Sequence, residues 1–248
     1  MFDAKKVKNE IVEWIRDWFE QNGKDCKAVV GVSGGIDSSV VTALCTEALG
    51  KDRVYGVLMP HGRQKDIEYS HLLCKFLDIS YQIFQIGTIV NVAEYEIKTT
   101  LDTELSNQTK INLPPRIRMA TLYAVSQTLN GRVINTCNMS ESYVGFDTIF
   151  GDSAGDMSPL SNLTKTEVIA LAKELRLPDE LVHKTPQDGL TGLTDEQSFG
   201  FTYAELDAYI RDGIEPNEDV KTKIDSMHEK NLFKLRPMDA FEYQKYVF

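Results

Sequence analysis

Residues 29–39 read Val29-Val30-Gly31-Val32-Ser33-Gly34-Gly35-Ile36-Asp37-Ser38-Ser39. The apolar start predicts a buried strand, and the apolar-faced stretch 40–49, which Gly50 ends, predicts a helix. The adjacent glycines between them predict a tight turn. A strand, a glycine turn and a helix in this order are typical of the phosphate-binding end of an α/β unit.

Strands and helices continue to alternate after this unit. We expect strands at 54–59, 81–86 and 132–136, and helices at 66–77, 94–105 and 117–129, the last beginning near Pro114 or Pro115. This alternation predicts a doubly wound α/β fold, with a mostly parallel sheet and helices on both faces. We expect residues 1–248 to form a single domain.

The carboxy-terminal half has a less regular pattern. Residues 139–161 are rich in Gly, Asp, Ser and Thr, which predicts a loop region near a site. Thr164-x-x-Glu167 is a capping-box signature that predicts a helix to about Leu175. We also expect helices at 203–210 and 218–227.

Composition excludes several classes of protein. A formal net charge of −10 argues against a nucleic-acid-binding face, which needs clustered Lys and Arg. The apolar runs are too short to cross a bilayer, and the amino terminus has a helical pattern with no signal segment, so we expect a cytoplasmic protein without membrane contact. The four cysteines stand singly, as expected of reduced thiols: Cys26, Cys45, Cys74 and Cys137.

The glycine turn has the chemistry that a pyrophosphate requires. Backbone N–H groups at the positive end of a helix bind phosphate, hydroxyls of Ser33, Ser38 and Ser39 add donors, and Asp37 can hold magnesium. A simpler reading is that Gly34-Gly35 only turns the chain and that Asp37 complements the helix dipole.

The complete loop from Ser33 to Ser39 resembles the signature of the N-type ATP pyrophosphatases, which cleave ATP to AMP and pyrophosphate and share the adenine nucleotide alpha hydrolase-like fold. Further segments resemble ammonia-dependent NAD synthetase. They are Asn112-Leu113-Pro114-Pro115-Arg116-Ile117-Arg118-Met119, Asn135-Thr136-Cys137-Asn138-Met139-Ser140-Glu141, Gly145-Phe146-Asp147-Thr148-Ile149-Phe150-Gly151-Asp152, Asp156-Met157-Ser158-Pro159-Leu160, Leu163-Thr164-Lys165 and Thr194-Asp195-Glu196. The similarity spans roughly residues 29–210.

The resemblance implies roles for individual residues. The expected ATP contacts are Gly31, Val32, Ser33, Gly34, Gly35, Ile36, Asp37, Ser38, Ser39, Thr136, Lys165 and Gln187. The expected magnesium ligands are Asp37 and Glu141, and the expected contacts to deamido-NAD are Arg116, Asp156 and Lys234. Considered singly, Arg116, Glu141 and Asp156 have simpler explanations, as a solvated helix face, a helix-start carboxylate and a turn former.

The sequence departs from the family pattern at four positions. Asn135 replaces an expected glycine, Ile149 replaces a lysine, Gln187 replaces a hydroxyl residue, and Phe233-Lys234 stands where His-Lys is expected. The ATP half of the pattern is therefore intact, and the dinucleotide half lacks one cation. Arg118 or Lys234 could supply that charge.

The implied reaction has two steps. The nicotinate carboxylate of deamido-NAD attacks the α-phosphorus of ATP, and ammonia then displaces AMP to give NAD. Asp37 and Lys165 are the expected catalytic residues of the first step. A carboxylate that holds ammonium and takes its proton would assist the second, and Asp152 is the candidate. The resemblance also implies a homodimer, and the chain has no room for the glutaminase domain of glutamine-dependent relatives.

Lys165 gives an independent argument for a bound anion. A cation in the first turn of a helix opposes the helix dipole. A triphosphate would compensate it, and so would a neighbouring carboxylate such as Glu167.

Two alternatives remain at this stage. The same ATP site could adenylate a different small-molecule acceptor. The chain could also be a nucleotide-binding module without enzymatic activity, because a fold does not fix a function.

Overall fold

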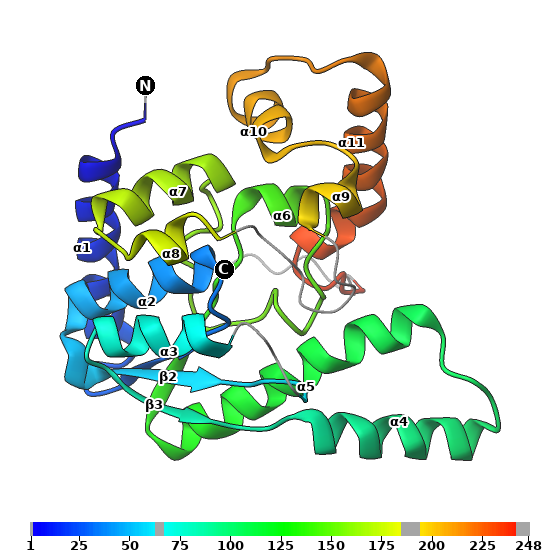
Figure 1. The fold of residues 1–248 in the computed structure, drawn as a ribbon, viewed down its shortest axis with the longest axis horizontal. Coiled ribbons are helices and arrows are strands. Elements are labelled where there is room, and N and C mark those ends of the chain that lie inside the picture. The colour runs from blue at the N-terminus through cyan, green and yellow to red at the C-terminus, as the bar shows by residue number, and fades with distance from the viewer. Residues whose placement is uncertain (1, 63–66, 185–193, 242–248) are drawn as a thin grey trace.

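The computed structural model describes residues 2–62, 67–184 and 194–241. Its parallel sheet has the strand order β3-β2-β1-β4 (Figure 1). The strands are β1 (Lys27–Gly31), β2 (Val54–Leu58), β3 (Ser80–Ile83) and β4 (Gly131–Ile134). In the register, Val30 of β1 pairs with Gly56 of β2 and with Ile134 of β4. The predicted α/β fold with a parallel sheet is confirmed.

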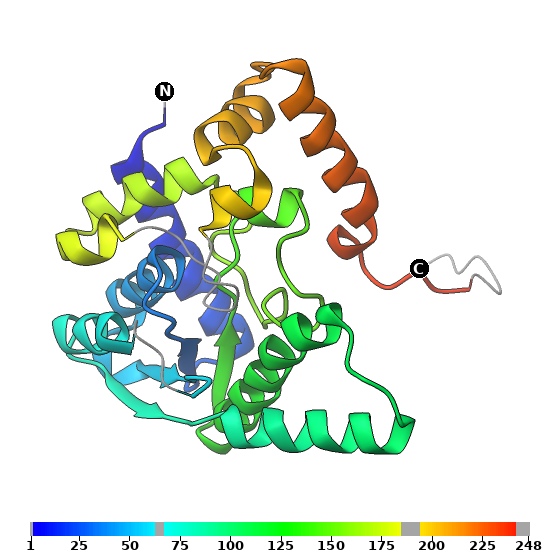
Figure 2. The same ribbon diagram turned by 45° about the vertical axis from the view of Figure 1, so that its right-hand side comes forward.

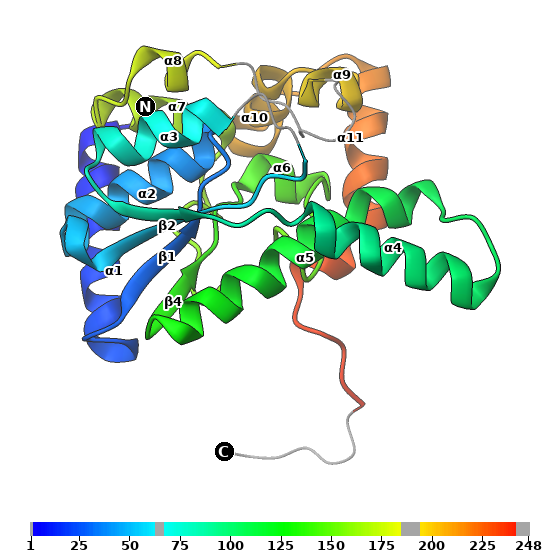
Figure 3. The same cartoon turned by 60° about the horizontal axis from the view of Figure 1, so that its bottom comes forward.

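Helices cover both faces of this sheet (Figure 3). The helices are α1 (Ala4–Asn22), α2 (Ile36–Leu49), α3 (Ile67–Phe76), α4 (Gly87–Leu101), α5 (Asn107–Thr128), α6 (Met139–Tyr143), α7 (Lys165–Glu174), α8 (Asp179–Val182), α9 (Asp195–Phe199), α10 (Tyr203–Asp212) and α11 (Glu218–Asn231). Short 3-10 turns occupy Lys51–Arg53 and Leu232–Leu235.

The core follows from the alternation of side chains along each strand. Ala28 and Val30 of β1 face a large cluster that includes Leu44 of α2 and Phe19 of α1. Val29 faces the opposite side, where α5 packs through Leu122. Both faces of β1 are therefore buried, which explains its continuous apolar sequence.

Helix α5 differs from the prediction. It begins at Asn107, seven or eight residues before the expected start at Pro114 or Pro115, because Ser106 caps its amino terminus by accepting the N–H of Thr109. Pro114 and Pro115 lie inside the helix and are buried. Proline normally marks a helix start because it lacks an N–H donor, but tertiary packing holds these two within the helix. Helix α4 likewise starts earlier than expected, at Gly87.

The carboxy-terminal helices build a second, smaller core. Phe199, Leu206 and Ile224 from α9, α10 and α11 pack together with Val144, which follows α6. Figure 2 shows α10 and α11 standing beside α6. This cluster fixes the helix starts of α9 and α10 next to the end of the sheet.

The order of the strands determines where a ligand can bind. The chain moves from β1 to β2 and β3 on one side, whereas β4 lies on the other side of β1. In doubly wound sheets, ligands bind at the carboxyl ends of the strands where the order reverses. Here that place lies between the residues following β1 and those following β4. Within the described ranges, no helix is both long and apolar enough to span a bilayer.

Candidate active site

A cavity of about 370 Å³ opens at the switch between β1 and β4. Its wall includes Ser33, Gly35 and Asp37 after β1, and Asn135 and Thr136 after β4. Further lining residues come from α5, from the loop after α6 and from α7: Arg118, Asp147, Thr148, Asp152 and Lys165. A volume of this order is in the range of nucleotide-sized pockets.

The glycine turn is held by its own hydroxyl groups. Gly34 has a φ of 78°, which only glycine adopts without strain. Ser33 Oγ accepts the N–H of Gly35 at 3.2 Å, and Ser38 Oγ donates to the Gly35 carbonyl at 3.1 Å. The turn therefore presents the start of α2, with its unpaired N–H groups, to the cavity.

Not every expected ATP contact faces the cavity. Gly31, Val32, Ser33, Gly35, Ile36, Asp37 and Ser38 line it. Ser39 is fully buried, and its hydroxyl donates to the Gly35 carbonyl at 2.7 Å. The structure gives Ser39 a role in holding the turn, while its contact with ATP stays a prediction. Gln187 falls outside the described residues.

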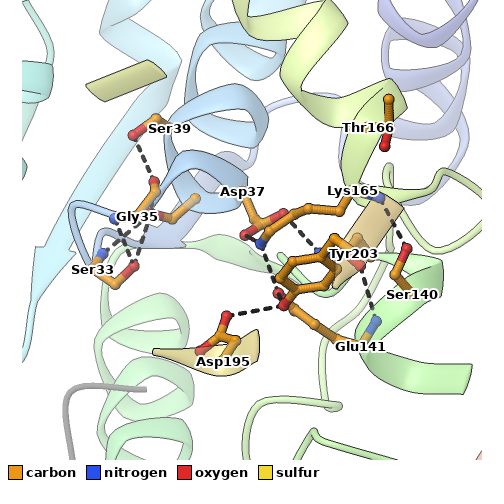
Figure 4. A network of polar contacts seen from close by, with 12 residues as sticks. Ser33, Gly35, Asp37, Ser39, Ser140, Glu141, Lys165, Thr166, Asp195 and Tyr203 are labelled. Carbon is orange, nitrogen blue, oxygen red and sulfur yellow. Dashed lines mark hydrogen bonds and ion pairs between the residues drawn. The ribbon is translucent and has the colours of Figure 1, made fainter. Parts of the chain in front are cut away.

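Lys165 lies between two carboxylates (Figure 4). Its Nζ is 2.7 Å from Asp37 Oδ2 and 2.7 Å from Glu141 Oε1, and its side chain is only 2% exposed. Asn138, the N-cap of α6, donates to the other oxygen of Asp37 at 2.8 Å. Three segments far apart in sequence thus meet at one ammonium group.

The charge of Lys165 is not neutralised by Glu167, the neighbouring carboxylate that the sequence suggested. Glu167 accepts the Thr164 N–H in the capping box and pairs with Arg211 at 2.6 Å. Asp37 and Glu141 instead neutralise the lysine at the first position of α7. The sequence cannot show this because both partners are remote along the chain.

Asp195 and Tyr203 complete the network, and the sequence analysis assigned neither of them a role. The Tyr203 hydroxyl is 2.9 Å from Asp195 Oδ2 and 3.2 Å from Glu141 Oε1, and its ring centre is 5.0 Å from Lys165 Nζ. A signal was present, because Thr194-x-x-Gln197 and Thr202-x-x-Glu205 form the same capping box as Thr164-x-x-Glu167. Each places the next residue at a helix start.

Burial and charge shift the ionisation of this network. Burial raises the pKa of the Glu141 carboxyl, and the neighbouring Asp37 adds to this, while Lys165 opposes it. Burial alone would lower the pKa of Lys165, but Asp37 and Glu141 raise it overall. Lys165 therefore remains a cation. Burial also raises the pKa of the Tyr203 hydroxyl, which stays neutral.

Asn135 explains one departure from the family pattern. Its side-chain amide donates to the carbonyls of Asp152 and Ala154 at 2.7 and 2.9 Å, and its oxygen accepts the N–H of Cys137 at 2.8 Å. A Cβ on Gly155 would come within 2.9 Å of the Asn135 backbone nitrogen. Asn135 thus ties the loop that carries Asp152 to the end of β4.

The expected dinucleotide contacts lie around the cavity and do not line it. Arg116 is exposed and donates to the Ile149 carbonyl at 3.3 Å. Asp156 accepts the Val133 N–H at 2.7 Å, so one of its oxygens holds the chain beside β4. Lys234 donates to the carbonyls of Gly145 and Asp147 at 2.8 and 3.0 Å. Their substrate contacts stay predictions.

Arg118 and Asp152 both line the cavity. Arg118 donates to the Met59 carbonyl at 3.1 Å, and burial lowers the pKa of its guanidinium. Asp152 accepts the Thr148 N–H at 3.2 Å. The residue opens onto the cavity, yet burial by the surrounding protein raises the pKa of its carboxyl. Of the two cations proposed to replace the missing lysine, Arg118 is the one that lines the cavity.

Comparisons with known proteins show the family to which this chain is similar. The profile of the family described as NAD synthase matches residues 7–244. An NH(3)-dependent NAD(+) synthetase of Thermococcus sibiricus is 38% identical over 244 residues, covering 97% of this chain and 91% of the relative. One from Fusobacterium nucleatum is 33% identical over 98% of this chain and 94% of the relative.

Two solved structures superpose over nearly the whole chain. NMN synthetase from Francisella tularensis has a TM-score of 0.88 at 30% identity and covers 98% of this chain and 100% of its own. NH3-dependent NAD synthetase from Campylobacter jejuni, solved with a nitrate ion, has a TM-score of 0.79 at 29% identity, with coverages of 97% and 100%.

Proposed function

We infer that this chain, which belongs to the NAD synthase family and catalyses the ATP- and ammonia-dependent synthesis of NAD from deamido-NAD, does so in the cavity between β1 and β4. The observation that carries the assignment is the meeting of Lys165 with Asp37 and Glu141 beside the glycine turn. A passive nucleotide-binding module has no need for a buried ammonium group between two carboxylates.

The glycine turn and Lys165 are proposed to bind the phosphates of ATP. In the first step, a nicotinate carboxylate oxygen bonds to the α-phosphorus, the bond from that phosphorus to the bridging oxygen breaks, and pyrophosphate leaves. The N–H groups at the start of α2 and the Lys165 ammonium oppose the charge that develops on the departing pyrophosphate. Positioning and charge stabilisation suffice, without a covalent protein intermediate.

The site has a donor set that fits magnesium. Oxygens of Asp37 and Glu141 approach the same Lys165 nitrogen, so they can converge on one cation. Within the described residues there is no group of three or more ligating side chains. Magnesium commonly uses one or two carboxylates and completes its shell with phosphate oxygens and water. We therefore assign Asp37 and Glu141 to hold it, where it would neutralise phosphate charge.

Asp152 is proposed to act in the amide-forming step. The ammonium ion passes one proton to this carboxylate, the ammonia nitrogen bonds to the acyl carbon, and the carbon–oxygen bond to AMP breaks as the nitrogen loses its second proton to the departing AMP phosphate. The surrounding protein raises the pKa of Asp152, which makes it a stronger base than an aspartate with the ordinary pKa. The Thr148 N–H fixes the carboxylate towards the cavity wall.

The decisive experiment measures AMP and NAD formation by purified protein given ATP, magnesium, deamido-NAD and an ammonium salt. We expect both products in equal amounts, and neither with Lys165→Ala. Pyrophosphate release without NAD would keep the ATP site and require another acceptor. No turnover with any acceptor would reject the catalytic assignment.

A second acceptor is favoured by one observation. The Francisella structure named NMN synthetase superposes with a higher TM-score than the Campylobacter enzyme. Ile149 also removes a cation from the dinucleotide side. We therefore propose a direct competition between deamido-NAD and nicotinate mononucleotide. A larger kcat/KM for the mononucleotide would make it the preferred acceptor in the same two-step chemistry.

The cellular setting is also a proposal. All four cysteines are buried free thiols, which supports a reducing compartment and hence the cytoplasm. The shared sheet and the contiguous main core support the interpretation of the chain as one domain. We also propose a homodimer, whose surface and test follow from the exposed face of α4.

A further inference from the structure

Asp147 is a buried carboxylate in the wall of the cavity that the mechanism above does not use. It follows α6, and the residue is only 8% exposed. Its Oδ2 lies 3.4 Å from the Ser142 hydroxyl, whereas Oδ1 is fully enclosed and has no hydrogen-bond partner in the described part of the chain. Lys234 approaches the main-chain oxygen of Asp147 and not its carboxylate.

A buried acceptor without a donor is unfavourable in the folded protein. Native structures satisfy nearly all such groups, and an exception at a site often marks a position that a ligand fills. Other carboxylates of the cavity are engaged: Asp37 and Glu141 share Lys165, and Asp152 accepts the Thr148 N–H. Asp147 Oδ1 has no donor among the described residues, whereas Asp195, another carboxylate of the cavity, accepts the Tyr203 hydroxyl.

The surroundings favour a cation over a neutral hydroxyl as the missing donor. Burial raises the pKa of the neighbouring Cys137 thiol, and the charges of Glu141, Asp147, Asp152 and Asp37 raise it further. These carboxylates therefore act on one region of the cavity. A hydroxyl would complete the hydrogen bond of Asp147 but would leave its charge, whereas a small cation satisfies both.

We propose that Asp147 binds the ammonium ion that supplies the amide nitrogen, together with Asp152. The inference rests on the proposed role of Asp152 in the same step. Ammonium is the cationic substrate of the reaction, and its four N–H donors can bond to both carboxylates at once. Asp147 then concentrates ammonium beside the acyl carbon, and Asp152 receives the proton.

Steady-state kinetics of Asp147→Asn test the proposal. With ATP and deamido-NAD saturating, we expect the KM for ammonium to rise about tenfold or more, because the amide keeps the shape but not the charge. The KM values for ATP and deamido-NAD should remain within about twofold. Asp225→Asn is the matched control, because that carboxylate accepts the Tyr209 hydroxyl outside the cavity.

A binding measurement covers the case in which the variant folds poorly. Thermal unfolding of the wild-type protein with ATP and magnesium is compared in ammonium chloride and in tetramethylammonium chloride at equal ionic strength. We expect a higher Tm in ammonium, and no such difference for Asp147→Asn or, if that variant does not fold, for Asp147→Ser. Equal Tm values for the wild type in both salts would overturn the proposal.

The outcomes separate this inference from the function itself. An unchanged KM for ammonium in Asp147→Asn, with normal NAD formation, rejects the ammonium site and leaves the reaction intact. A raised KM for deamido-NAD alone would show that Asp147 binds a substrate hydroxyl, which also rejects it. Wild-type protein that forms no NAD at any ammonium concentration would reject the catalytic assignment first.

Discussion

Lys165 illustrates how a residue acquires its role from partners that are distant in sequence. At the first position of α7 it opposes the helix dipole, and it is nevertheless almost fully buried. The negative charges of Asp37 and Glu141 offset this unfavourable interaction with the helix dipole. In the proposed function, Lys165 would pair with the phosphates of ATP, and Asp37 and Glu141 would hold magnesium.

Replacing Lys165 should therefore affect both catalysis and stability. For Lys165→Met we expect kcat for NAD formation to fall about 10²- to 10³-fold, as for the loss of one charge-stabilising donor. Two carboxylates left facing each other should also destabilise the fold by about 3–5 kcal/mol. Lys173→Met, on the exposed side of α7, is the control. Near-normal kcat in Lys165→Met would contradict the assignment.

Replacing Asp152 with asparagine should raise the stability of the fold and lower the rate of NAD formation. Its folded-state pKa lies above the ordinary value of about 3.9, so ionisation costs the folded protein free energy. The stability that the Asp152 carboxyl contributes is fully present at a pH below its ordinary, unfolded-state pKa. It is lost as the pH rises through the higher folded-state pKa. Asp152→Asn should therefore gain stability relative to wild type between about pH 4 and neutrality.

The same substitution should slow the ammonia-dependent rate about 10²-fold, because it removes the proton acceptor. Urea unfolding across a pH series, together with NAD formation across the same series, measures both effects. Asp212→Asn, an exposed position, is the control. If the rate of Asp152→Asn equals that of wild type at every pH, Asp152 does not accept the proton.

At the scale of the elements, the site is built from helix starts. Asp37 lies in the first turn of α2 and Glu141 in that of α6, while Lys165, Asp195 and Tyr203 are the first residues of α7, α9 and α10. Each helix start carries partial positive charge, although the first N–H groups of α7 are already bonded to Ser140, Asp207 and Thr164. Their convergence makes one end of the sheet suited to a polyanion such as ATP (Figure 4).

The cap of α7 should matter to activity as well as to stability. Thr164→Ala removes the capping box immediately before Lys165, which should lower stability by about 1–2 kcal/mol. Asn217→Ala removes the cap of α11, which carries none of the network residues, and should cost about 1 kcal/mol. We expect a raised KM for ATP in Thr164→Ala alone. Equal KM values in both variants would indicate that the cap does not position Lys165.

Tyr203 should couple α10 to the carboxylates of the site. Tyr203→Phe removes only the hydroxyl that contacts Asp195 and Glu141, and we expect kcat to fall about tenfold through misplaced carboxylates. Because the hydroxyl approaches Glu141, the magnesium concentration for half-maximal rate should rise too. Tyr209→Phe on the same helix removes a 2.9 Å bond to Asp225 and should leave both values unchanged. A variant indistinguishable from Tyr209→Phe would remove Tyr203 from the mechanism.

At the scale of the whole molecule, α4 projects away from the sheet (Figure 3). Ile89, Val92 and Tyr95 are 50%, 57% and 65% exposed and follow one another at helical spacing. An exposed apolar strip of this kind is typical of a subunit interface.

A single charge should test this interface. We expect wild-type protein to have the mass of a dimer by light scattering, and Val92→Glu to have that of a monomer, because a buried unpaired carboxylate is costly. Ile214→Glu is the control, since Ile214 is 61% exposed between α10 and α11 and away from α4. Monomeric wild type, or dimeric Val92→Glu, would exclude α4 as the interface.

Several features of the fold and the site could be predicted from the sequence. The apolar run before Gly34 predicted β1, and the Thr164 capping box predicted α7, because these signals depend on neighbouring residues alone. The start of α5 was predicted wrongly, because the packing of Pro114 and Pro115 overrides the local preference of proline. The role of Tyr203 was missed because its partners come from other helices.

The sequence by itself determined the alternation of strands and helices and the glycine turn, because these depend on local pattern, and the resemblance of its motifs to a known family indicated the reaction. Only the tertiary structure decided which charges meet. The strand order β3-β2-β1-β4 brings residues after β1 beside those after β4. The small carboxy-terminal core then sets α9 and α10 against that edge. Lys165 consequently forms one ionic group with Asp37 and Glu141. The tertiary structure also buries Asp147 so that its Oδ1 has no hydrogen-bond donor among the described residues.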